Sequence, residues 1–154
     1  MSIAYLKGDA TSPQTAGPKI IAHIVNDAGG WGKGFVLALS KRWPQPENDY
    51  RDWYAQRVKK PFALGEISLV EVGPPAMWVC NMVAQHGLHA RNGKPPIRYD
   101  ALEKCLGALN RAAKTLNASI HMPRIGCGLA GGKWELVEPL IARTLTVPVY
   151  VYDF

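Results

Sequence analysis

The chain of 154 residues has the size of one domain and an ordinary globular composition, with 47% hydrophobic and 19% charged residues. No apolar run approaches the roughly 20 residues that span a bilayer, and the N-terminal MSIAYLKGDA lacks the pattern of a signal peptide. Cys80, Cys105 and Cys127 form neither a CxxC pair nor a metal-binding spacing, and an odd number of cysteines argues against a disulfide framework. We therefore predict one cytoplasmic domain over residues 1–154, with no metal, no cofactor and no membrane partner.

The net charge of +6 fits a ligand or partner that carries phosphate, and it fits simple solubility equally well. Basic residues are scattered over 41–42, 57–60 and 91–98, and they form no continuous stripe. Charge alone therefore permits a nucleic-acid partner without indicating one.

Apolar periodicity and turn residues predict strands that alternate with helices. In chain order we expect strands over 3–6 and 19–26, helices over 35–43 and 46–58, strands over 65–72 and 77–84, a helix over 99–117, a strand over 119–126, a helix over 134–145 and a last strand over 147–154. The segment 19–26 is apolar almost throughout, which suits a strand buried on both faces. Pro139 should kink or split the last helix. This alternation predicts an α/β domain with a largely parallel sheet.

The histidines do not indicate a metal site. His23 lies inside an apolar strand, where a hydrogen-bonded core histidine is the simpler interpretation. His86 and His89 lie in a segment rich in glycine and proline that we predict to be a loop, and Cys80 is the only further metal-ligating residue type nearby.

Two glycine-rich loops indicate a phosphate-bearing ligand. NDAGGWGKG (26–34) follows the second strand and GCGLAGGKW (126–134) follows the fifth, and both run directly into helices. Ligands of open α/β sheets bind beyond the carboxyl ends of the strands, and glycine lets a phosphate approach backbone N–H groups at a helix N-terminus. Neither loop has the GxGxxG or GxxxxGK[ST] pattern, so a Rossmann cofactor or a P-loop is disfavoured. We predict a diphosphate held from both sides.

Three residues beside these loops have both a structural and a functional interpretation. Asp9 ends the first strand, where it could accept a hydrogen bond from the amine of a base or bond to its own turn. Trp31 and Trp134 could cover a ribose or pack the loops onto the sheet.

Taken together, YLKGDAT, VNDAGGWGKGF, CNMVAQ, MPRIGCGL and VYVYDF resemble the macrodomain family, whose members bind ADP-ribose. The motifs occur in the family's order along nearly the whole chain. They are most similar to the branch that contains the terminal ADP-ribose protein glycohydrolase and the macrodomain of a chromatin-remodelling helicase. The resemblance implies a three-layer α/β/α fold around a mixed, largely parallel six-stranded sheet, with ADP-ribose over the strand ends.

The resemblance also assigns ligand-binding residues. They are Asp9, Ala10, Gly30, Trp31, Gly32, Lys33, Gly34, Ala84, Gly126, Cys127, Gly128, Leu129 and Tyr152. Asp9 would accept from the adenine amine, with Ala10 beside it and Tyr152 at the border of the adenine pocket. The loop 126–129 would hold the diphosphate, and 30–34 would close over the diphosphate and distal ribose, with Lys33 as a charge at the rim.

Two departures from this branch bear on the chemistry. Gln85 stands where the branch has a lysine that attacks the anomeric carbon, and Ala130 stands where it has an aspartate after GCGL. Glutamine cannot form the covalent adduct and alanine cannot act as a base, so the lysine mechanism is excluded by this alignment.

Two functions then remain. In the first, the protein hydrolyses ADP-ribose esters of acidic side chains through a water held by Gln85, Asn26 or Asp27, with the substrate's own diphosphate as the base. ADP-ribosylated DNA is the alternative substrate. In the second, the protein is a non-catalytic reader of free or attached ADP-ribose. A lone domain suits an enzyme better than a reader, so we expect the hydrolase, with ADP-ribose and ADP-ribosylated protein as partners.

Overall fold

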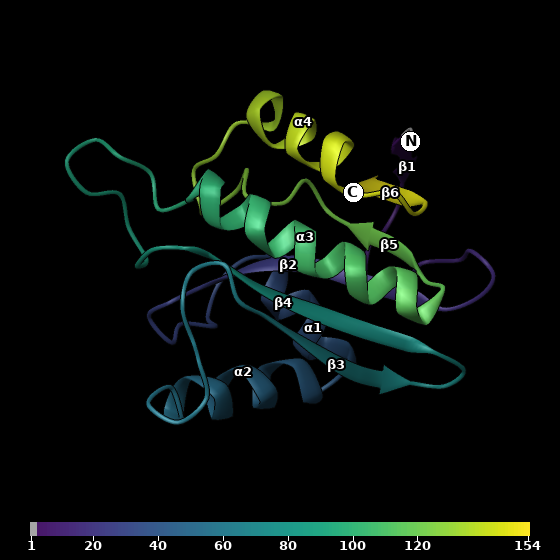
Figure 1. The fold of residues 1–154 in the computed structure, drawn as a ribbon, viewed down its shortest axis with the longest axis horizontal. Helices are drawn as coiled ribbons and strands as arrows, with labels where there is room; N and C mark the ends of the chain where they lie inside the picture. The colour runs from purple at the N-terminus through teal and green to yellow at the C-terminus, as the bar shows by residue number, and fades with distance from the viewer. Residues whose placement is uncertain (1–2) are drawn as a thin grey trace.

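The computed structural model describes residues 3–154 and contains the predicted elements in the predicted order (Figure 1). They are β1 (Ile3–Lys7), β2 (Lys19–Asn26), α1 (Phe35–Arg42), α2 (Gln45–Ala55), β3 (Ile67–Gly73), β4 (Met77–Gln85), α3 (Tyr99–Leu116), β5 (Ser119–Met122), α4 (Trp134–Thr144) and β6 (Val149–Asp153). β5 is shorter than predicted because Pro123, which has no N–H for a strand ladder, follows Met122 directly. Pro139 lies inside α4, which continues through it, so of the two predicted effects, a kink or a split, the split does not occur.

The sheet has the strand order β1-β6-β5-β2-β4-β3, and each neighbouring pair is parallel except β3 and β4. β2 lies between β5 and β4, which explains its apolar sequence, because both of its faces are covered. Five parallel strands place the carboxyl ends of β1, β2, β4, β5 and β6 at one edge of the sheet. The loops that carry the predicted ligand residues all leave from this edge.

Helices cover both faces of the sheet, with α3 and α4 on one side and α1 and α2 on the other (Figure 1). Leu102, Leu106 and Leu109 of α3 are fully buried against the first face. Leu39 of α1 and Tyr50 of α2 are fully buried against the second. Burying a large apolar side chain stabilises a fold by about 1.5–3 kcal/mol, so the two apolar layers hold the sheet edge in place. The predicted three-layer α/β/α architecture is confirmed.

Candidate functional site

Three loops meet at the carboxyl edge of the sheet. An ideal Cβ placed on Gly34 would lie 3.2 Å from Leu129 Cδ1, so the two glycine-rich loops touch. A Cβ on Gly30 would lie 2.8 Å from Leu88 Cδ2, so the loop after β4 also packs on the first glycine-rich loop. The structure thus brings together two loops that are about a hundred residues apart in sequence.

Each glycine-rich loop opens onto a helix N-terminus that has no side-chain cap. Gly34 precedes α1 with φ 84°, and Lys133 precedes α4, and neither makes a side-chain hydrogen bond to the first turn. α1 also has no acidic residue in its first turn. Uncapped N–H groups and the helix dipole together favour an anion at such a position.

The glycines of the loops divide into two kinds. Gly126 has φ 77°, and a Cβ there would lie 2.5 Å from Ile97 Cδ1, so the fold itself requires glycine. Gly32 and Gly128 have no positive φ, and a Cβ on either would meet nothing within 4 Å. The protein's own packing therefore leaves open space at Gly32 and Gly128, where a ligand can approach the backbone.

Asn26 organises the first glycine-rich loop. Its Oδ1 accepts hydrogen bonds from the N–H of Ala28 at 3.0 Å, the N–H of Gly30 at 3.0 Å and the hydroxyl of Tyr50 at 2.9 Å. Its Nδ2 donates to the carbonyl of Gly30 at 2.8 Å. The side chain is buried, and one amide hydrogen is left for any further partner.

Asp27 and Gln85 lie side by side at the ends of β2 and β4, because the N–H of Asp27 donates to the carbonyl of Gln85 at 2.9 Å. Asp27 Oδ1 accepts from the N–H of Gly87 at 2.8 Å, and Oδ2 lies 2.7 Å from His86 Nδ1. Gln85 Nε2 donates to the carbonyl of Gly87 at 3.1 Å. Sequence reasoning considered His86 only as a metal ligand and missed this pair, although its position directly after Gln85 placed it at the strand end.

Asp9 makes the predicted turn and also lies beside an arginine. Its Oδ1 accepts from the N–H and the hydroxyl of Thr11, at 2.8 and 2.7 Å, which is the expected turn. Its Oδ2 lies 3.3 Å from the guanidinium of Arg42, at the end of α1. Burial raises the pKa of the Asp9 carboxyl, but hydrogen bonds from Thr11 and Arg42 outweigh it, so the net pKa is below the usual value. The carboxylate is ionised and partly exposed, as an acceptor for an amine must be.

The two tryptophans have different surroundings. Trp31 is buried, donates from Nε1 to Ser40 at 2.8 Å and packs against the Tyr50 ring. Its side chain therefore packs the loop onto the fold, and only its backbone can face a ligand. Trp134 is half-buried, donates to the Tyr5 hydroxyl at 3.0 Å and lies beneath the guanidinium of Arg124.

Two interior histidines are uncharged. His23 Nε2 lies 2.5 Å from Asn81 Oδ1, while Nδ1 has no hydrogen-bond partner within residues 3–154, so the expected hydrogen-bonded core histidine is only half satisfied. Its ring lies against Trp31, which offers no acceptor or donor to Nδ1. Burial lowers the pKa of both His23 and His121 to about 4. His121 Nδ1 lies 2.8 Å from the hydroxyl of Tyr152, a predicted ligand residue whose side chain is buried.

The remaining predicted residues differ in exposure. Ala10 and Ala84 are buried, and the carbonyl of Ala84 accepts from the N–H of Arg98. Lys33 is exposed, as a rim charge should be. Cys127 is half-buried and burial raises the pKa of its thiol, which makes it a poor nucleophile. Leu129 is exposed where the two glycine-rich loops meet.

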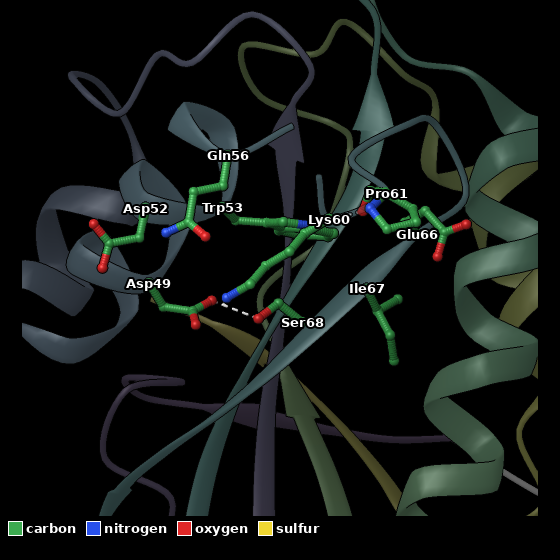
Figure 2. Close-up of a pocket in the computed structure, with 9 residues that line it drawn as sticks. All are labelled: Asp49, Asp52, Trp53, Gln56, Lys60, Pro61, Glu66, Ile67 and Ser68. Carbon is green, nitrogen blue, oxygen red and sulfur yellow. Dashed lines mark hydrogen bonds between the residues drawn. The ribbon is translucent and has the colours of Figure 1, made fainter. Parts of the chain in front are cut away.

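Two cavities lie apart from the glycine-rich loops. One of about 410 Å³ lies between α2 and the start of β3, where Asp49 accepts a hydrogen bond from Ser68 and the Lys60 side chain extends across the opening (Figure 2). The other, of about 540 Å³, includes Thr15 and Ser119 at the amino ends of β2 and β5. Neither is lined by the glycine-rich loops, so neither is the predicted ligand site.

Over residues 3–154 no group of three or more acidic, histidine or cysteine side chains could hold a metal ion. Over the same residues no helix combines the length and apolarity needed to cross a membrane.

The chain resembles known proteins over its whole length. It is 34% identical to the mouse chromodomain-helicase-DNA-binding protein 1-like over 99% of this chain, which spans about a fifth of that relative (18%). It is 28% identical to the ADP-ribose 1''-phosphate phosphatase of Candida albicans, over 97% of this chain and 98% of the relative.

Solved structures show the same fold. A Bacteroides thetaiotaomicron protein of unknown function is 52% identical, with a TM-score of 0.95 over 100% of this chain and 99% of the other. A Streptomyces coelicolor macrodomain protein is 51% identical, with a TM-score of 0.88 over 99% of each chain. The macrodomain of Mycobacterium tuberculosis DarG is 23% identical, with a TM-score of 0.78 over 99% and 98%. The Macro domain family model matches residues 22–141. The chain therefore belongs to the macrodomain family.

Proposed function

We propose that this macrodomain binds ADP-ribose at the carboxyl edge of its sheet and hydrolyses ADP-ribose esters of acidic side chains. The observation that carries the proposal is the contact between two glycine-rich loops, each of which opens onto an uncapped helix N-terminus. Such an arrangement offers backbone N–H groups to a diphosphate from two sides.

The resemblance to the family assigns the other groups of ADP-ribose. The ionised carboxylate of Asp9 accepts from the adenine amine, beside Ala10 and the ring of Tyr152. Residues 126–129 hold the diphosphate, and 30–34 cover it together with the distal ribose. The anomeric carbon then lies toward Asn26 and Gln85, at the ends of β2 and β4.

Hydrolysis proceeds without a covalent intermediate, because Gln85 and Ala130 replace the nucleophile and the general base that the lysine mechanism would need. An ester of ADP-ribose has a good leaving group, so an oriented water is sufficient. The loop N–H groups stabilise charge that develops in the transition state. The Candida albicans relative supports this chemistry, since its name describes removal of a substituent from the 1'' position of ADP-ribose.

The alternative is a non-catalytic reader of ADP-ribose. It is supported by the absence of both expected catalytic residues and by the helicase relative, in which the matched region is a small part of a larger protein. ADP-ribosylated DNA is the alternative substrate, which the net charge of +6 permits.

Binding is tested with two glycine variants that spare the fold. Because a Cβ on Gly32 or Gly128 meets no protein atom within 4 Å, Gly32→Ala and Gly128→Ala should leave the free energy of unfolding within about 0.5 kcal/mol of wild type. Both should bind ADP-ribose at least tenfold more weakly by calorimetry, because the methyl group occupies the space of the ligand. Wild-type affinity in both would contradict the assigned site.

Hydrolysis is tested with a peptide that carries ADP-ribose on glutamate, with ADP-ribosylated single-stranded DNA and ADP-ribose 1''-phosphate measured in parallel. The hydrolase releases ADP-ribose from the peptide well above the blank. Tight ADP-ribose binding with no release from any of the three substrates identifies a reader instead. Gln85→Ala should slow release if its amide orients the water.

A further inference from the structure

The ends of β2 and β4 hold a carboxylate and a histidine in a fixed arrangement. Asp27 Oδ2 lies 2.7 Å from His86 Nδ1, although the two residues are 59 positions apart in sequence. Asp27 is itself held in place, because its Oδ1 accepts from the N–H of Gly87 and its own N–H donates to Gln85. The side chain of Asp27 is 21% exposed and that of His86 is 54% exposed. Asp27 is therefore held against the protein, while the imidazole ring of His86 is open to solvent.

This arrangement selects one tautomer of His86. A carboxylate oxygen can only accept, so Nδ1 carries the proton that lies between the two residues. The lone pair is then on Nε2, at the opposite side of the ring, and no side chain within residues 3–154 hydrogen-bonds to Nε2. An aspartate that fixes a histidine in this way is the arrangement by which hydrolases prepare a general base.

The other polar side chains at these strand ends are weaker bases toward water than a free imidazole nitrogen. Asn26 Oδ1 already accepts from three donors, and Gln85 is a neutral amide. Each carboxylate oxygen of Asp27 already accepts one hydrogen bond, from the N–H of Gly87 and from His86 Nδ1. Within residues 3–154, Nε2 of His86 accepts no hydrogen bond from any side chain, so its lone pair is available to a water.

We propose that His86 is the general base of the hydrolysis and that Asp27 is its positioning residue, an inference that rests on the proposed function. Nε2 takes one proton from a water whose oxygen forms a bond to the anomeric carbon of the distal ribose. The bond from that carbon to the ester oxygen breaks, and its electron pair leaves with the carboxylate of the modified side chain. The products are ADP-ribose and the free acidic residue, and the imidazolium returns its proton to solvent.

The position of the loops supports this role. Leu88, two residues after His86, packs on Gly30, so the loop that begins at His86 lies against the glycine-rich loop assigned to the distal ribose. His89 lies on the same loop and is exposed, but it has no hydrogen-bond or ion-pair partner in the described part of the chain and therefore no fixed orientation. His89 serves as the matched control.

The test measures steady-state release of ADP-ribose from the glutamate-linked peptide by wild type, His86→Ala and His89→Ala, with ADP-ribose affinity measured by calorimetry. A general base contributes about 10²- to 10⁴-fold to a rate. We expect kcat of His86→Ala to fall by roughly that factor while KM and ADP-ribose affinity change less than about threefold. His89→Ala should retain the wild-type kcat. Because the imidazole of His86 is exposed, added imidazole should restore part of the rate in His86→Ala and should not stimulate wild type or His89→Ala.

Asp27→Asn tests the positioning role. Asparagine keeps an acceptor for Gly87 and offers its NH₂ group to Nδ1, which favours the tautomer with the proton on Nε2. We expect kcat to fall with ADP-ribose affinity retained, and the double variant Asp27→Asn/His86→Ala to be no slower than His86→Ala alone, since both act through one group.

The outcomes separate the base from the proposed function. Wild-type release with an unchanged kcat in His86→Ala overturns the assignment of His86 and leaves the hydrolase in place. A rate loss in His86→Ala that imidazole does not restore, and that multiplies with the loss in Asp27→Asn, also overturns it and indicates a structural role. Absence of release by wild type, with ADP-ribose bound, overturns the hydrolase and the base together.

Discussion

The substitution Asn26→Ala removes the side chain around which the first glycine-rich loop is built. It takes away the acceptor of the Ala28 and Gly30 N–H groups and the donor to the Gly30 carbonyl. The Tyr50 hydroxyl keeps a second acceptor, the Asn26 carbonyl at 2.6 Å, which the substitution retains. Ala28 is exposed, so water replaces its lost partner, whereas Gly30 is only partly accessible.

The destabilisation expected for Asn26→Ala can be worked out from the backbone groups of Gly30 that lose their partner. An unsatisfied buried donor or acceptor costs about 1–3 kcal/mol, and partial access to water brings the two groups of Gly30 to the low end of that range. We therefore expect the ordered loop to be destabilised by about 2 kcal/mol. If ADP-ribose binds only the ordered loop, the same free energy weakens its affinity by roughly 30-fold.

Tyr50→Phe distinguishes an effect through the loop from direct contact with the ligand. Tyr50 is fully buried and touches Asn26 from the interior, while the N–H of Gly29 donates to its hydroxyl at 3.1 Å. Calorimetry on wild type, both single variants and the double variant gives the coupling free energy. We expect Tyr50→Phe to weaken ADP-ribose binding by itself and the two effects to be less than additive. Unchanged affinity in Tyr50→Phe, with a large loss in Asn26→Ala, would refute the loop argument and leave Asn26 in direct contact with the ligand or its water.

Three further predictions concern stability and ligand selectivity. Burial lowers the pKa of His23 and His121 from 6.5 to about 4. Between these values the unfolded chain binds protons that the folded chain does not. The free energy of unfolding should therefore fall as pH drops from about 6.5 toward 4. The loss is about 1.4 kcal/mol per pH unit for each histidine, or roughly 2 kcal/mol each at pH 5. In urea unfolding measured across this pH range, His23→Gln should reduce the dependence of the unfolding free energy on pH. An unchanged pH dependence would contradict the lowered pKa of His23. Asp9→Ala should weaken ADP-ribose binding and should also abolish the preference for ADP-ribose over its hypoxanthine analogue, which lacks the exocyclic amine, whereas a retained preference places the adenine elsewhere. Gly126→Ala should lower the free energy of unfolding by about 1–3 kcal/mol, because it combines a φ of 77° with a contact at 2.5 Å, and Gly128→Ala in the same loop should not.

Local patterns in the sequence were sufficient for the element order, the buried position of β2 and the helices that follow both glycine-rich loops. Each of these features depends on neighbours a few residues apart, through apolar periodicity, proline and glycine. The end of β5 was missed, although Pro123 was visible, because one proline at the end of an apolar run does not show which residue makes the last ladder bond.

Tertiary structure decided what the polar residues of the site do. Trp31 and Asn26 could each face a ligand or support a loop, and only the positions of Tyr50 and Ser40 on neighbouring helices show how their side chains are held. The pairing of Asp27 with His86 depends on β2 and β4 lying next to each other in the sheet. Hydrogen bonds between residues far apart in sequence are set by strand order and register, which no local pattern encodes. For this protein the sequence alone therefore predicted which loops meet at the carboxyl edge of the sheet, and the fold determined which of their side chains are held by hydrogen bonds.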